Sequence, residues 1–329
     1  MEQRRLSGKG HWYHETQSNH CPADVLPLVP EAAYVDDRFL LDLALPNTIL
    51  DAHARWLIPA RALCSLLFPL RVQVSRLRTL SAYDRLSTAL TVAQACGVQR
   101  LCNHYAALLA PLPGPDSSRE SNRRLAEITQ YARQLASSPD VIDAKAQQQL
   151  DEVGLTLYDQ VVINQIIGFV GFQARMVAAF QALSGLPVRW LPGHHIQPHA
   201  LAEELDLEEW HSILPGVELP NASARQLESL ARWHILGALA PVLCHEAQLL
   251  DLTGEILTSG IETNEPALCA SPAFAAAADL LARSPDRFSA AQLTPLTEAG
   301  ATQAQAINLL AWSAFSGWLA RLKIALRKP

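Results

Sequence analysis

The chain has 329 residues, of which 49% are apolar and 18% are charged, so it is long and apolar enough to build two folded domains. Its net charge is -6 and its pI is about 6.0, and its Lys and Arg residues are scattered. The composition argues against disorder, and the charge argues against nucleic acid as a partner, because nucleic-acid binding requires a basic surface.

Two segments bear on location. The basic first ten residues continue into His11 and Trp12 and not into an apolar run, so they do not resemble a signal peptide. The apolar stretch 161–180 contains Asn164, Gln165, Gln173 and Arg175, which argues against a membrane span. The six cysteines are widely spaced and include no Cys-x-x-Cys pair, as in a reducing compartment. We expect a cytoplasmic protein that does not contact a membrane.

Strand signals are nearly absent, and Ala, Leu and Gln dominate, so the sequence predicts an all-α fold. Prolines, glycines and capping residues divide it. The predicted elements begin with a polar arm over 1–22, helices over 37–45 and 48–67, and a helix pair or one bent helix over 81–109. Asp116, Ser117 and Ser118 then cap a helix that runs to Ser137. A short helix begins at Asp143 or Ala144 and ends at Gly154, and Thr156 caps the long helix that follows.

Part of the sequence occurs twice. Residues 132–179 align without a gap on residues 278–325, and 16 of the 48 positions are identical. The identities include Ser-Pro-Asp, a helix-ending glycine and a Gly/Arg pair. Because all these identities are separated by the same number of residues, they predict a duplicated helical unit. We therefore expect an arm over 1–22, a first domain over 23–185, a connector over 186–220 with one helix over 199–210, and a second domain over 221–329.

Each long repeat helix carries a glycine and, one turn later, an arginine: Gly171 and Arg175 in the first copy, Gly317 and Arg321 in the second. A glycine inside a helix costs about 1 kcal/mol relative to alanine, and close approach of another helix would compensate for it. Each arginine is expected either to hold a carboxylate or helix carbonyls, or to reach solvent.

Several motifs resemble a known family. The run Leu80-Ser81-Ala82-Tyr83-Asp84-Arg85 is followed by Val92-Ala93, Gly97 and His104, and later by "LASSP", "LDEVGLTLYD" and "IIGFVGFQAR". This pattern resembles the carboxymuconolactone decarboxylase and alkylhydroperoxidase D superfamily, well over about 25–185 and more weakly over 210–329. The resemblance implies a tandem of alkylhydroperoxidase D-like helical domains, the second truncated, in a peroxidase-related oxidoreductase. It also implies a homo-oligomer, trimeric or hexamer-like, which a light-scattering mass of only 36.0 kDa would contradict.

The resemblance does not extend to the family's redox motif. Active members have a glutamate, eleven intervening residues and then Cys-x-x-Cys-x-x-x-His, since one thiol attacks peroxide, the other resolves the sulfenic acid, and His with Glu relays the proton. Without gaps these roles fall on Leu86, Val98, Leu101 and Tyr105. A shift of one residue recovers only Cys102, as the second thiol.

Two functions of different class follow. In the first, the chain is a one-cysteine thiol peroxidase in which Cys102 reacts with peroxide, a small thiol donor resolves it, and His104, Tyr105, Arg85 and Asp84 surround it. In the second, the chain is a ligand-binding or scaffolding homologue that has lost redox chemistry. The sequence favours Cys102 as a packed core residue over a reactive thiol, and Asp84 with Arg85 fits an ion pair at a helix start just as well as a site.

No cofactor is expected, because the sequence holds no phosphate loop, Gly-x-Ser-x-Gly elbow or HExxH motif. His194, His195 and His199 have a spacing that suits a metal. Pro198 breaks the helix that would align them, so we expect no metal site.

Overall fold

The computed structural model describes residues 31–187, 193–197, 247–258 and 271–326. These residues form helices and no strand, which confirms the all-α prediction. The α-helices, in chain order, are α1 (Asn47–Ala52), α2 (Ala54–Leu67), α3 (Ala82–Cys96), α4 (Gln99–Leu109), α5 (Arg119–Ser137), α6 (Ala144–Glu152), α7 (Leu157–Leu183), α10 (Ala247–Thr258), α12 (Pro272–Arg283), α13 (Ala290–Glu298) and α14 (Gln303–Leu326). The 3-10 helices are η1 (Glu31–Ala33), η2 (Pro139–Val141) and η6 (Pro285–Arg287).

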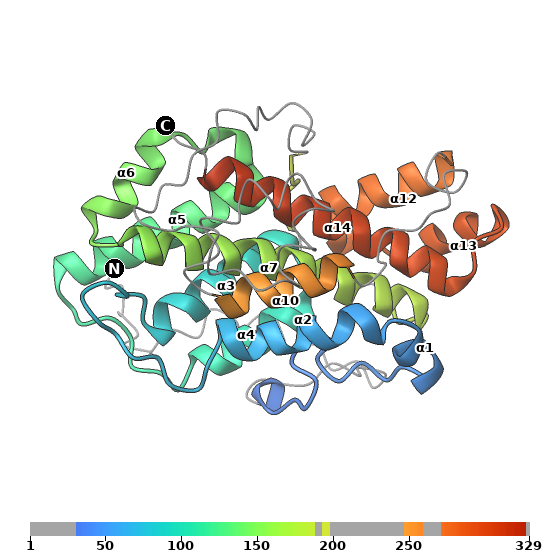
Figure 1. The fold of residues 1–329 in the computed structure, drawn as a ribbon, viewed down its shortest axis with the longest axis horizontal. Coiled ribbons are helices and arrows are strands. Elements are labelled where there is room, and N and C mark those ends of the chain that lie inside the picture. Colours follow the sequence, from blue (N-terminus) through green and yellow to red (C-terminus); the bar gives the residue numbers. More distant parts are fainter. Residues whose placement is uncertain (1–30, 188–192, 198–246, 259–270, 327–329) are drawn as a thin grey trace, which may run out of the picture.

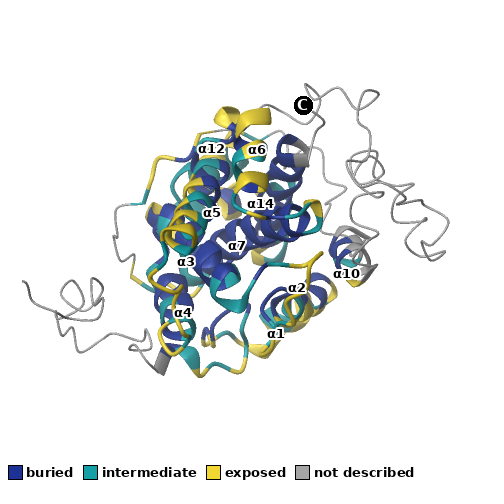
Figure 2. Cartoon of the chain, turned by 90° about the vertical axis from the view of Figure 1, so that its left-hand side faces the viewer, coloured by how far each residue is buried: buried dark blue, intermediate teal, exposed yellow. Residues whose placement is uncertain are grey.

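Helix α7 is the centre of the molecule. It runs antiparallel to α14, and α3 and α5 pack against its other sides (Figure 1). Helix α10 packs against α2. Figure 2 shows α7 as an almost continuously buried ribbon, surrounded by helices that also carry intermediate and exposed residues. Because α7 is apolar on every face, it has to be enclosed by other helices.

Within the described residues, α7 is the one helix whose length and composition would allow it to cross a membrane, and 89% of its most apolar window is buried inside the protein. Its polar side chains have partners in neighbouring helices. Tyr131 donates to Asn164 at 2.8 Å, Trp318 donates to Gln165 at 3.0 Å, and Tyr105 donates to Gln173 at 2.7 Å. These bonds fix the rotation of α7, since turning it would leave buried polar groups unpaired.

The predicted helix over 37–45 is wrong. This segment is a turn in which Leu41 and Asp42 have positive φ angles of 56° and 52°. The carboxylate of Asp37 accepts from the backbone N–H groups of Phe39 and Leu40, and that of Asp42 accepts from those of Asp36 and Asp37. Aspartate carboxylates that bond to nearby backbone compete with helix formation, and here they hold a turn.

Other predictions along the chain are refined. The helix expected over 48–67 breaks at His53 into α1 and α2, and the stretch 81–109 is the helix pair α3 and α4. Gly97 separates that pair in the left-handed conformation, at φ 69°. The capping predictions hold at Ser118, at Asp143 and at Thr156, which forms a capping box.

The sequence repeat recurs in the helix boundaries. The second-copy elements η6, α13 and α14 each begin 146 residues after η2, α6 and α7, which is the offset of the sequence alignment. Gly154 and Gly300, at φ 81° and 96°, lie at equivalent positions after α6 and α13. The predicted domain borders fall at the edge of, or within, residues outside the described ranges, and they stay a prediction.

The two copies exchange equivalent contacts across the α7–α14 interface. Phe172 packs edge-on against Phe315 with ring centroids 5.9 Å apart, and the equivalent pair, Phe169 and Trp318, packs edge-on at 5.8 Å. Phe172 and Trp318, which are themselves equivalent, meet at 6.0 Å. A pattern in which each residue meets the equivalent of its partner defines a local two-fold axis, which passes near Phe172 and Trp318.

The close helix approach predicted at Gly171 lies one turn earlier. A Cβ on Gly168 would sit 1.9 Å from Cδ1 of Trp318, whereas a Cβ on Gly171 would meet only Nη1 of Arg175, at 3.3 Å. Trp318 therefore packs directly on the backbone of α7 at Gly168.

Candidate functional site

Cys102, the thiol that the resemblance singles out, is packed in the core on α4. Its residue is 1% exposed, and its neighbours include the thiol of Cys96, also on the buried side of its helix. Burial raises the pKa of the Cys102 thiol far above its usual value. It therefore stays protonated at neutral pH and is a poor nucleophile.

His104 and Tyr105 are held by other groups and do not serve Cys102. Nδ1 of His104 donates to the backbone carbonyl of Ala32 at 2.7 Å, and burial lowers the pKa of His104 to about 4. The hydroxyl of Tyr105 donates to Oε1 of Gln173 at 2.7 Å, and burial raises its pKa. Neither side chain has a hydrogen bond to Cys102.

Asp84 and Arg85 face different parts of the molecule. Asp84 completes the capping box of α3 with Ser81 and lies 3.4 Å from Nη2 of Arg124. Arg85 donates from Nη1 to the carbonyl of Leu67 at 3.1 Å. The sequence suggested an ion pair between Asp84 and Arg85, whereas in the structure Asp84 pairs with Arg124. The rings of His104 and Tyr105 lie 5.4 Å apart, while Asp84 and Arg85 bond to groups other than Cys102.

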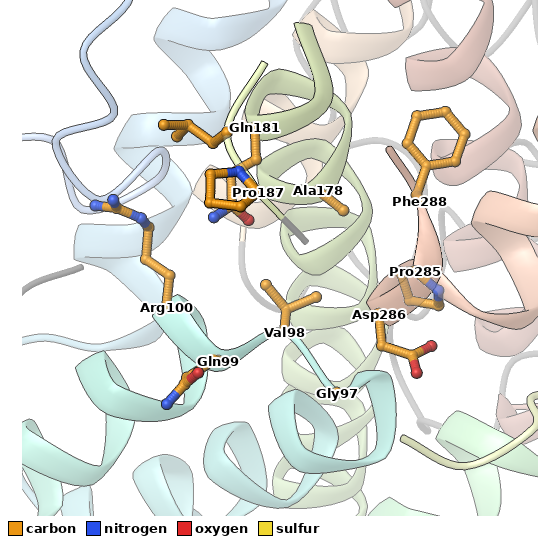
Figure 3. A pocket seen from close by; sticks show the side chains of 11 residues that line it. Gly97, Val98, Gln99, Arg100, Ala178, Gln181, Pro187, Pro285, Asp286 and Phe288 are labelled. Carbon is orange, nitrogen blue, oxygen red and sulfur yellow. The ribbon is translucent and has the colours of Figure 1, made fainter. Parts of the chain in front are cut away.

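The four positions that carry the redox roles in the family are apolar or partnered in this chain. Leu86, Val98, Leu101 and Tyr105 are all at most 9% exposed. Val98 lines a cavity of about 30 Å³ between the α3–α4 turn, α7 and η6 (Figure 3). That volume admits only a few water molecules. Leu86 lines a second cavity, of about 110 Å³, together with Arg85.

A larger cavity, of about 430 Å³, opens at the N-terminal end of α3. We call it the Tyr83 cavity. Its walls come from the start of α3, the proline-rich α4–α5 loop and the first turns of α5. The lining residues are Thr79, Ser81, Ala82, Tyr83, Asp84, Leu112, Pro113, Gly114, Pro115, Ser121, Arg124 and Leu125. Asp84 is the one predicted site residue among them.

Arg124 holds the polar side of the Tyr83 cavity in place. Its Nη2 donates to Oγ1 of Thr79 at 3.1 Å and to the Thr79 carbonyl at 3.2 Å, and its Nη1 donates to the carbonyl of Val153 at 3.0 Å. Asp159 accepts from the backbone and the hydroxyl of Thr79. The cavity is therefore preformed on its polar side, where an arginine and a carboxylate are held in place, and the phenol ring of Tyr83 completes the lining.

Sequence reasoning named neither Tyr83 nor Arg124 as a cavity residue. Tyr83 lies inside the Leu80–Arg85 motif, so a signal for it was present. Arg124 lies on a polar helix face among other charges, and only the fold brings it to Asp84, 40 residues earlier in the chain.

The histidine-rich segment does not form a metal site in the part of the chain that the structure describes. No group of three or more His, Cys, Asp or Glu side chains lies together there. His194 and His195 are partly or largely exposed, and the backbone N–H of His194 donates to the carbonyl of Ala95 at 2.9 Å. His199, together with the helix predicted over 199–210 and the arm over 1–22, lies outside the described residues.

Comparison with known proteins assigns no family to the chain. No protein-family model matches it, and no curated protein matches it. The superfamily resemblance therefore stays a prediction, and the functional argument depends on the geometry of the site.

Proposed function

We propose that the chain is a ligand-binding protein of the carboxymuconolactone decarboxylase and alkylhydroperoxidase D type that has lost the thiol redox chemistry of its relatives. The observation that carries the proposal is that the thiol of Cys102 and the Tyr83 cavity are separate, since Cys102 does not line the cavity. Cys102 is buried in the core with a protonated thiol, while a preformed cavity of about 430 Å³ opens at Tyr83. A cavity of this size suits a small organic molecule.

The setting is proposed to be a cytoplasmic homo-oligomer. Three cysteines in the described residues, Cys64, Cys96 and Cys102, are free thiols, as expected in a reducing compartment. The loop between α2 and α3 exposes Leu70 by 99% and Leu77 by 64%, and exposed apolar side chains of this kind favour contact with another subunit.

Replacement of Cys102 by serine tests the loss of redox chemistry. We expect the wild-type protein to consume hydrogen peroxide with dithiothreitol no faster than buffer does, and Cys102→Ser to behave identically. The reason is that a buried, protonated thiol cannot attack peroxide. Peroxide consumption by the wild-type protein that disappears in Cys102→Ser would establish the one-cysteine peroxidase instead.

Replacement of Gly114 by leucine tests the binding cavity. A Cβ at Gly114 would lie 3.8 Å from the hydroxyl of Tyr83, an ordinary contact, so the larger side chain is expected to fill the cavity without straining the loop. In a thermal-shift screen of small metabolites, ligands that stabilise the wild-type protein should lose at least tenfold in affinity for Gly114→Leu.

Tyr83→Phe is the matched control, because it removes one hydroxyl and leaves the shape of the cavity intact. It should keep the wild-type ligand set, with affinity reduced only where the hydroxyl bonds to the ligand. An unchanged ligand set and affinity in Gly114→Leu would place the binding site elsewhere and contradict the proposal.

A further inference from the structure

Two buried arginines, Arg175 of α7 and Arg321 of α14, occupy equivalent positions in the two copies and exchange contacts across the local two-fold axis. Nη2 of Arg175 donates to the carbonyl of Ala282 at 2.6 Å, and Nη2 of Arg321 donates to the equivalent carbonyl, that of Ala136, at 2.9 Å. Each arginine thereby caps the C-terminal end of the other copy's preceding helix, α12 or α5.

Helix carbonyls compensate these charges only in part. Arg175 is 5% exposed and Arg321 is 4% exposed, and in the described part of the chain neither forms an ion pair with a carboxylate. The C-terminal end of a helix carries about half a negative charge, so α5 and α12 together supply about one against two guanidinium charges. Burial and the neighbouring charge of Arg175 lower the pKa of Arg321 to about 9. Asp286, a buried carboxylate that influences the same thiol, Cys96, as both arginines do, offsets part of the remaining charge.

Both arginines are among the residues that line a cavity of about 350 Å³ at α12 and α14, which we call the arginine cavity. It is separate from the Tyr83 cavity and shares no lining residue with it. Polar and apolar residues both line the arginine cavity. The polar lining residues are Arg175, Gln197, Asp279, Arg283, Ser313, Ser316 and Arg321, and the apolar ones include Phe274, Ala278 and Trp312.

Within the described residues, the two copies differ at this place. Ser313 and Ser316 are half-buried and line the arginine cavity, whereas the equivalent residues of α7, Ile167 and Val170, are fully buried in the core. Another carboxylate of the lining, that of Asp279, already accepts from Nε of Arg283 at 2.6 Å and is not paired with Arg175 or Arg321. The second copy thus has hydroxyl groups where the first copy has packed aliphatic side chains.

We propose that the arginine cavity binds a small organic oxyanion, a carboxylate or phosphate group on an apolar body. The planar guanidinium groups of Arg175 and Arg321 match the geometry of either oxyanion, and the free N–H groups of Arg175, whose Nε has no bond in the described residues, are available to it. The hydroxyls of Ser313 and Ser316 supply further donors. The apolar body lies against Trp312 and Phe274.

Titration calorimetry with benzoate, phenyl phosphate and benzamide on the full-length chain tests the proposal. Benzoate or phenyl phosphate should bind in a saturable way, and the stronger of the two identifies which oxyanion the cavity prefers. Benzamide has nearly the shape of benzoate but no charge, so it should bind at least tenfold more weakly. Equal affinity for benzoate and benzamide, or no binding of either anion, would overturn the proposal.

Variants locate the binding. Arg321→Gln and Arg175→Gln should each weaken the bound anion at least tenfold, because each removes one charged donor. Arg123→Gln is the matched control, since it removes an arginine whose side chain is 57% exposed and paired with Glu152 on the surface. It should leave affinity unchanged.

Ser316→Leu keeps the test decisive if loss of a capping arginine unfolds the protein. It fills the arginine cavity from α14 and leaves both arginines in place, so it should abolish anion binding while the helical circular dichroism spectrum stays that of the wild type. Wild-type affinity in a folded Ser316→Leu protein would refute the assignment. Because Gly114→Leu acts on the other cavity, it should not change benzoate binding, so this proposal and the one for the Tyr83 cavity fail separately.

Discussion

Replacement of Gly168 by alanine is expected to lower the free energy of unfolding by about 3 kcal/mol, although alanine favours a helix by about 1 kcal/mol. The added Cβ would lie 1.9 Å from Cδ1 and 2.5 Å from Nε1 of Trp318, so one of the two helices has to move. Trp318 is 1% exposed, packs on Phe169 and Phe315, and donates to Gln165, so it has no free space to enter. Urea denaturation followed by circular dichroism measures the loss.

The neighbouring glycine of the same helix is the control. Gly171→Ala brings the new Cβ to 3.3 Å from Nη1 of Arg175, the far end of a flexible side chain, and should change stability by less than about 1 kcal/mol.

A double variant tests the same clash. Gly168→Ala combined with Trp318→Phe should be more stable than the sum of the single changes predicts, because the smaller ring relieves the clash. Equal losses at the two glycines would contradict the packing described for α7 and α14.

The repeat explains why much of the fold was predictable. Caps, stop signals and the 146-residue offset are local features, and the structure reproduces them as equal boundaries for η2 and η6, α6 and α13, and the starts of α7 and α14. The error over 37–45 also has a local origin, because Asp37 and Asp42 bond to nearby backbone groups and hold a turn where a helix was predicted.

The candidate site was less predictable, because burial depends on contacts that are distant in sequence. Nothing near Cys102 in the sequence shows that its thiol is enclosed, or that His104 bonds to a carbonyl 72 residues away. The sequence did suggest the type of partner for the two repeat arginines, since helix carbonyls were one of the predicted alternatives. That each arginine reaches the other copy, and that a cavity opens beside them, required the fold.

Stability is expected to fall by about 2 kcal/mol between pH 7.5 and pH 5 through His104 alone. The pKa of His104 is lowered from its usual 6.5 to about 4 in the folded protein, chiefly by burial. The unfolded chain therefore binds a proton at His104 below pH 6.5 that the folded chain binds only near pH 4. The stabilisation is complete above pH 6.5 and is lost as the pH falls toward 4. Urea denaturation across this range measures the slope.

His104→Gln isolates this contribution. Glutamine can still donate to the carbonyl of Ala32 but does not titrate, so the variant should lose stability at neutral pH by a constant amount and have a shallower dependence on pH below 6.5. His53, whose pKa is also lowered by burial, is present in both proteins and cancels in the comparison. The opposite outcome is an equal loss of stability in the wild-type protein and His104→Gln between pH 7.5 and pH 5. That result would mean that His104 is protonated or accessible in the folded state, and it would contradict the buried, neutral His104 described above.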